Sequence, residues 1–113
     1  METTHWYKVK EENKLLTPGL LVYPERIKEN IASMIKIAGG IGRLWPHIKT
    51  HKMREVVKLQ MEQGITRFKC ATLGEVELLI SCNVTHILLA HQPTEEKAKY
   101  FLSLQASNPQ IQF

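Results

Sequence analysis

The sequence predicts an α/β protein in which short strands alternate with helices to form a parallel sheet. Apolar segments typical of strands begin near residues 44, 67, 86 and 111. They recur at intervals of about 20–25 residues, and helical patterns fill the spaces between them. Two architectures fit this pattern: an open doubly wound sheet, or part of a (β/α)8 barrel.

The first two helices are predicted from apolar spacing and from end signals. Pro24 suits the first position of a helix, and Gly39-Gly40 ends that helix. A second helix is predicted from Met53 to Gln63, with Gly64 placed to terminate it. The apolar positions of the first helix are Ile27, Ile31, Met34, Ile35 and Ala38.

Two further helices have recognisable beginnings. Thr72 and Glu75 match a capping box, in which the threonine caps the first turn and the glutamate reaches back. The fourth helix begins over residues 93–96, and Asn108-Pro109 ends it. The predicted buried side of this helix comprises Ala98, Phe101, Leu102 and Leu104.

The predicted strands differ in regularity. Leu44–Ile48 is expected to be irregular, because Pro46 cannot donate a hydrogen bond to a neighbouring strand. Phe68–Ala71 is short, and His86–Ala90 has the composition of a strand buried on both faces. Ile111–Phe113 resembles the first residues of one more strand.

Composition indicates a small globular protein. The chain has 113 residues, of which 43% are hydrophobic and 23% charged, so one core is expected. No segment is apolar enough to span a bilayer, and two cysteines are too few for a disulfide framework, so we expect a cytoplasmic protein. The net charge is +4, but the basic residues are scattered among acidic ones, so no nucleic-acid partner is expected.

The segment from Trp45 to Lys52 concentrates potential chemical groups at the end of a predicted strand, which is where barrels place catalytic residues. Lys49 can form a Schiff base with an aldehyde only as the neutral amine. The cationic side chains of Lys52, His47 and His51 favour that state. A basic loop in water is the alternative that spacing alone leaves open.

Other candidate residues have simpler explanations. His47 and His51 have a spacing that would suit a metal on a helix, but Pro46 and Ile48 disfavour a helix there, so no metal ligand is assigned. Thr72 caps a helix and is also a candidate contact to a cofactor. His91 and Gln92 are interpreted as loop residues, and Cys70 as a core residue.

The segment Pro-His-Ile-Lys-Thr-His-Lys, residues 46–52, resembles the cofactor-lysine motif of the D-threonine aldolase and D-serine dehydratase family. These are fold-type III pyridoxal-phosphate (PLP) enzymes, related to alanine racemase through their N-terminal barrel. The likeness extends from about residue 17 to residue 113. It includes Thr-Pro-Gly-Leu-Leu-Val at 17–22, Cys-Ala-Thr-Leu-Gly-Glu-Val-Glu at 70–77 and His-Ile-Leu-Leu-Ala at 86–90.

The resemblance implies a PLP-dependent lyase for D-amino acids, in which Lys49 forms the Schiff base and is the catalytic residue. His47, Thr50, His51 and Thr72 are then implied to bind the cofactor. Relatives also use a divalent metal, whose ligands lie in a C-terminal β-domain outside this chain. A D-amino acid substrate and a homodimer of the full-length protein are implied as well.

The resemblance also implies how the chain is organised. Residues 1–16 would be an N-terminal arm, and residues 17–113 the N-terminal portion of an alanine racemase-like (β/α)8 TIM barrel. A complete barrel needs about 250 residues, so we expect this chain to be partial and inactive by itself. Amino-acid racemization and PLP binding without catalysis are alternatives. Trp45 departs from the family, which usually has arginine there, and this puts substrate preference in question.

Overall fold

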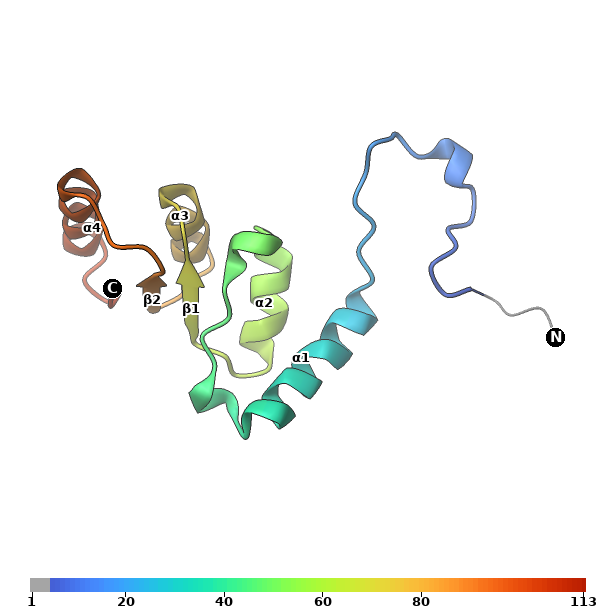
Figure 1. Ribbon diagram of the computed structural model, residues 1–113, viewed down its shortest axis with the longest axis horizontal. Helices are drawn as coiled ribbons and strands as arrows, with labels where there is room; N and C mark the ends of the chain where they lie inside the picture. Colours follow the sequence, from blue (N-terminus) through green and yellow to red (C-terminus); the bar gives the residue numbers. More distant parts are fainter. Residues whose placement is uncertain (1–4) are drawn as a thin grey trace.

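The computed structural model describes residues 5–113, which form alternating helices and strands (Figure 1). The two strands are β1 (Arg67–Cys70) and β2 (His86–Leu89). The α-helices are α1 (Pro24–Ala38), α2 (Arg54–Glu62), α3 (Leu73–Ser81) and α4 (Glu95–Ser107). Short 3-10 helices occupy Glu12–Lys14 (η1), Ile41–Arg43 (η2) and Ile48–Thr50 (η3).

The sheet is parallel, as predicted, and is centred on β1 and β2. Phe68 is paired with Ile87, and Cys70 with Leu89. Single parallel bridges extend the sheet at both edges, from His47 to Lys69 and from His86 to Gln112. The described residues therefore form an α/β unit with a two-stranded sheet, and they do not close into a barrel.

The strand predicted over Leu44–Ile48 is wrong, because the chain makes only one bridge there. Pro46 has no N–H, although its carbonyl accepts a hydrogen bond from the Lys69 N–H at 2.8 Å. Directly afterwards, Ile48 enters the 3-10 turn η3. The strand predicted from Ile111 is likewise reduced to the bridge at Gln112, whose N–H donates to the Thr85 carbonyl at 2.7 Å.

The helix ends largely follow the sequence signals. Gly39 has φ 76°, a left-handed conformation that glycine adopts readily, and it caps α1. The Thr72 hydroxyl accepts a hydrogen bond from the Glu75 N–H at 3.3 Å, as the capping box predicts. The carboxylate of Glu75 does not complete the box, however, since it accepts from the N–H of Ala71 instead.

The core lies between the sheet and the helices, and α3 and α4 lie behind the strands in Figure 1. Side chains alternate across β1, so Phe68 and Cys70 are fully buried while Arg67 and Lys69 point to the other face. The prediction for α4 holds for Phe101 but not for Leu102, which is 66% exposed. Consecutive helical residues are about 100° apart, which turns Leu102 away from the side that buries Phe101.

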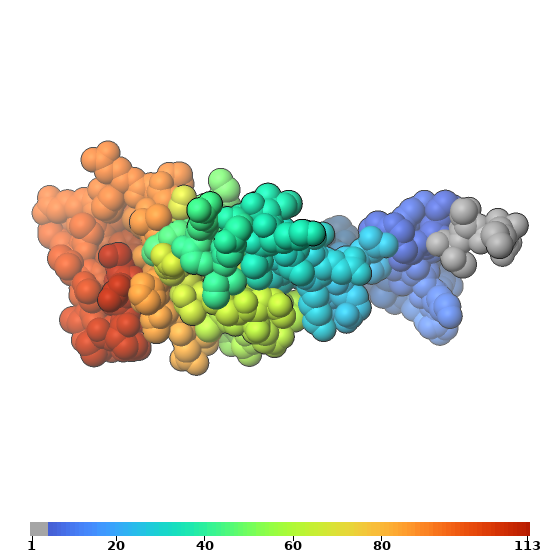
Figure 2. Space-filling model, turned by 90° about the horizontal axis from the view of Figure 1, so that it is seen from below, coloured from blue at the N-terminus to red at the C-terminus, as the bar shows by residue number. Residues whose placement is uncertain are grey.

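The N-terminal arm extends beyond the start of α1 (Figure 2). Its contacts to that helix are aromatic and polar. The Arg26 guanidinium lies 3.7 Å from the centre of the Trp6 ring, and the Tyr23 hydroxyl donates to the Tyr7 carbonyl at 2.9 Å. No helix within residues 5–113 has the length and apolar character needed to cross a membrane.

Candidate functional site

The segment from His47 to Lys52 forms a tight turn after the edge of the sheet. Ile48 is completely buried and anchors the turn in the core. Lys49 and Thr50 are exposed and belong to the same 3-10 turn, η3. Burial of the single residue Ile48 thus leaves the Lys49 amine accessible while its backbone is held against the core.

A row of side chains crosses the sheet on the face opposite the helices. Paired residues of parallel strands point to the same face, so His47 lies in a row with Lys69 and Leu88. Arg67 belongs to the same face, and its guanidinium lies 5.5 Å from the centre of the Trp45 ring. Of the two cations on this face, Lys69 is the one paired with His47, directly before the turn that carries Lys49.

Arg67 lies next to Trp45, the residue at which this chain differs from the resembled family. The resembled family usually has arginine where this chain has Trp45, and here a guanidinium from the neighbouring strand is stacked on that tryptophan. The guanidinium also donates to the Gly42 carbonyl at 2.8 Å, so it is held at the start of β1.

The two histidines act as local caps. The Nδ1 atom of His47 accepts from the Lys49 N–H at 3.1 Å, and that of His51 accepts from the Met53 N–H at 3.0 Å. Burial, followed by the charge of Lys49, lowers the pKa of His47, and burial likewise lowers the pKa of His51. Both rings are therefore neutral near pH 7, with the remaining proton on Nε2.

The Nε2 atom of His51 is buried and has no hydrogen-bond partner. His51 lines a cavity of about 390 Å³ together with Trp6 of the arm, Tyr23 and Met53. A larger cavity, of about 540 Å³, is lined by Tyr7 to Leu21 alone and holds none of the predicted site residues. Its lining is mostly apolar, with Lys8 and Glu12 as the charged residues, so the segment around Lys49 remains the better candidate site.

Lys52 and Glu75 form a pair that the sequence did not reveal. The Lys52 Nζ lies 2.6 Å from Glu75 Oε1 and 2.8 Å from the carbonyl oxygen of Lys49. Burial raises the pKa of Glu75, but the bonds from Lys52 and from Ala71 outweigh it, so the pKa is lowered overall. Glu75 is therefore a buried anion directly beneath the turn.

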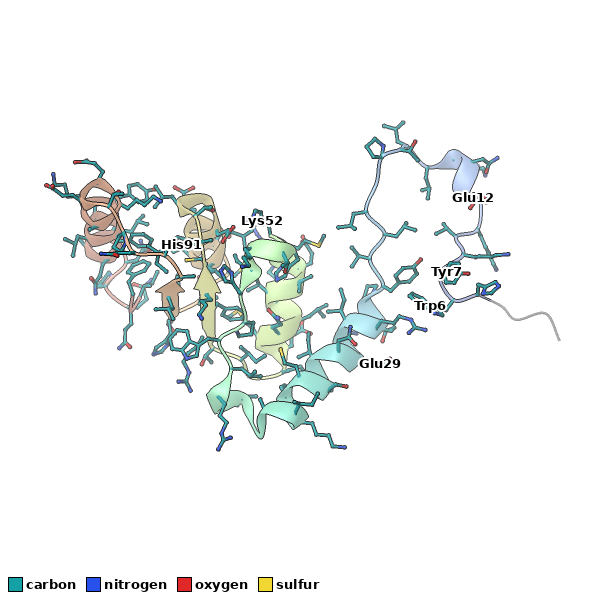
Figure 3. The ribbon with its side chains drawn as sticks, viewed as in Figure 1. Trp6, Tyr7, Glu12, Glu29, Lys52 and His91 are labelled. Atoms are coloured by element: carbon teal, nitrogen blue, oxygen red, sulfur yellow. The ribbon has the colours of Figure 1, made fainter. Side chains whose placement is uncertain are left out.

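The remaining predicted residues are dispersed around this turn. Lys52 and His91 lie near the end to which the β1 arrow points (Figure 3). His91 is exposed, but it is close enough for its charge to lower the pKa of His47. Thr72 is engaged as the cap of α3. Burial raises the pKa of Cys70 to about 12, as expected for a core thiol rather than a nucleophile.

Within residues 5–113 no three His, Cys, Asp or Glu side chains lie together in a way that could hold a metal ion. His47 and His51 each use Nδ1 to bond the backbone.

Comparison with protein families identifies the chain. The family model described as "Alanine racemase, N-terminal domain" matches residues 22–107, which is most of the chain and includes the whole segment around Lys49. Neither the curated proteins nor the solved structures gave a match. The chain belongs to the alanine racemase N-terminal domain family, which consists of PLP-dependent proteins of fold-type III.

Proposed function

We propose that this chain is the cofactor-holding part of a PLP-dependent lyase for D-amino acids, with Lys49 as the residue that binds PLP covalently. The observation that carries the proposal is the position of Lys49. It presents an accessible primary amine from a turn that Ile48 anchors, within the segment that resembles the cofactor-lysine motif.

The residues around Lys49 fit the chemistry of PLP, which is an aldehyde with an anionic phosphate. The amine of Lys49 is the group that reacts with aldehydes. Lys69 is on the same side of the sheet as His47 and provides a positive charge for an anion. When bound, PLP acts as an electron sink that stabilises negative charge at the substrate Cα.

The chain's own residues have separable tasks. Lys49 Nζ holds the cofactor and, when it is free, is the amine in this segment that can accept a proton from the substrate Cα. The neutral His47 accepts the Lys49 N–H and so fixes the turn. His47, Thr50, His51 and Thr72 stay proposed cofactor-binding residues. Thr50 is exposed in the turn η3, and Thr72 is exposed at the start of α3.

The choice of D-threonine aldolase or D-serine dehydratase chemistry rests on Thr-His-Lys following Lys49. Amino-acid racemization and non-catalytic PLP binding are the competing functions. We propose that residues 17–113 form part of a (β/α)8 barrel after an arm at 1–16, and the parallel bridge from His86 to Gln112 supports a further strand beyond β2. We further propose that the full-length protein is a cytoplasmic homodimer. It would bind a divalent metal through residues outside this chain.

Borohydride reduction in the presence of PLP, followed by peptide mapping, tests the role of Lys49 in the full-length protein. We expect the cofactor to be fixed on Lys49, and Lys49→Ala to abolish the visible absorbance of the bound cofactor. Lys58→Ala, an exposed lysine of α2, is the matched control and should leave that absorbance unchanged. Label on any other lysine would contradict the assignment.

Substrate assays then separate the chemistries. Release of aldehyde from D-threonine indicates the aldolase, and release of keto acid and ammonia from D-serine indicates the dehydratase. Interconversion of D- and L-alanine with neither product indicates a racemase. Bound PLP with no turnover of any of these substrates indicates the non-catalytic alternative.

A further inference from the structure

We propose that Lys52 and Glu75 are positioning residues that hold the backbone of Lys49 in the orientation that binds the cofactor. This inference rests on the proposed function, because it assumes that Lys49 carries PLP. It assigns a role to a lysine and a buried carboxylate that the proposed chemistry does not otherwise use.

The bonding pattern links three segments through one carboxylate. Oε1 of Glu75 lies 2.6 Å from the Lys52 Nζ, and Oε2 accepts from the Ala71 N–H at 2.6 Å. The same Lys52 ammonium donates to the Lys49 carbonyl at 2.8 Å. The first turn of α3, the residue that follows β1 and the turn η3 are therefore tied together beside Lys49.

Glu75 is buried far more deeply than its partner Lys52. Its side chain is 2% exposed, whereas that of Lys52 is 57% exposed, so the anion is the fixed partner. An exposed pair would exchange with water, but a buried carboxylate with two short bonds has few alternative geometries. These bonds fix the position of the Lys49 carbonyl relative to the N-terminus of α3.

The backbone of Lys52 supports a specific role. Its φ is 49°, in the left-handed region that non-glycine residues seldom occupy. Such conformations persist where surrounding contacts over-determine them, and they cluster at functional sites. Here the ammonium of Lys52 reaches back three residues to Lys49 and at the same time meets Glu75.

Variants of the full-length protein test this role with PLP titration and with a readout that needs no cofactor. Lys52→Gly removes the ammonium but suits the left-handed backbone, and Lys52→Arg keeps the charge. Glu75→Gln removes the anion. Lys99→Met and Glu77→Gln are matched controls, because they remove one charge from the Lys99–Glu95 pair on α4 and one from the Tyr100–Glu77 contact between α4 and α3.

We expect the PLP dissociation constant to rise about tenfold or more in Lys52→Gly and Glu75→Gln, as loss of a charge-assisted hydrogen bond predicts. Lys52→Arg should stay closer to wild type than either. In the cofactor-free protein, trinitrobenzenesulfonate followed by peptide mapping should show a changed modification rate at Lys49, with Lys58 unchanged. The two control variants should match wild type in both measurements.

The outcomes separate the two proposals. If wild-type protein is labelled by borohydride and PLP on a lysine other than Lys49, the proposed function fails, and this inference fails with it. If Lys49 is labelled but Lys52→Gly and Glu75→Gln bind PLP like wild type, only the positioning role is wrong. A fall in thermal stability with unchanged PLP affinity and Lys49 modification would assign the pair a purely structural role.

Discussion

Truncation of Ile48 to alanine should destabilise the fold strongly, because this side chain anchors the turn that carries Lys49. Ile48 is 0% exposed and packs in the core with residues such as Val57 and Phe68. Removing its outer carbons leaves a cavity that a turn held on both sides by backbone bonds cannot easily close. The Lys52 N–H, for example, donates to the Ile48 carbonyl at 2.8 Å.

The expected size follows from burial. Replacement of a fully buried isoleucine by alanine costs about 2–5 kcal/mol, and Ile48→Val should cost only about 0.5–1.5 kcal/mol. Ile37 is the matched control, since it is 87% exposed on α1. Ile37→Ala should stay within about 0.5 kcal/mol of wild type, because little apolar surface is lost from the core.

Urea unfolding followed by circular dichroism measures these differences, with the slope of the transition checking that each variant unfolds to a similar state. The reasoning would be refuted if Ile48→Ala lost no more stability than Ile37→Ala. A PLP titration of Ile48→Val connects packing with the site. If the turn positions Lys49, its cofactor affinity should decrease although most of the stability remains.

Three further predictions concern protonation. Because the pKa of Glu75 is lowered on folding, its carboxylate stabilises the folded state fully above the ordinary pKa of 4.5. This stabilisation is lost as the pH falls through the folded-state pKa, so Glu75→Gln should flatten the acid limb of a curve of stability against pH. Because the pKa values of His47 and His51 are lowered on folding, their contribution to the stability of the fold is complete above pH 6.5. It is lost as the pH falls through the folded-state pKa values, which NMR titration of the two rings can locate. Cys70, whose pKa is raised to about 12, should resist iodoacetamide at pH 8 in the folded protein and react after unfolding, as mass spectrometry would show.

Local signals were sufficient for the helices and for the two central strands. Pro24 and Gly39 mark the ends of α1, and Thr72 marks the start of α3, because each acts on backbone groups within a few residues. The segment before Lys49 was harder to predict. Its apolar pattern suggested a strand, but Pro46 and the turn at Ile48 leave a single bridge.

The pairing of Lys52 with Glu75 could not be read from local patterns, since 23 residues separate the two. The sequence assigned Glu75 to a capping box, which explains its place near the start of α3 but not its burial. The available signal was that both charged residues follow predicted strands of adjacent strand–helix units. The ends of parallel strands meet at one edge, so such residues are brought together.

The polar face of the sheet supports the proposed barrel over the doubly wound alternative that the sequence left open. In a doubly wound sheet, helices cover both faces, and strand residues on either face are mainly apolar. Here the helices face Phe68 and Ile87, while Arg67 and Lys69 occupy the opposite face and are half-buried beside Trp45 and His47. A second helix layer would have to desolvate these two cations. A barrel interior that opens toward an anionic ligand at the C-terminal ends of the strands would instead give Lys69 a partner, and Lys49 at the end of the first strand-like segment would face the same ligand.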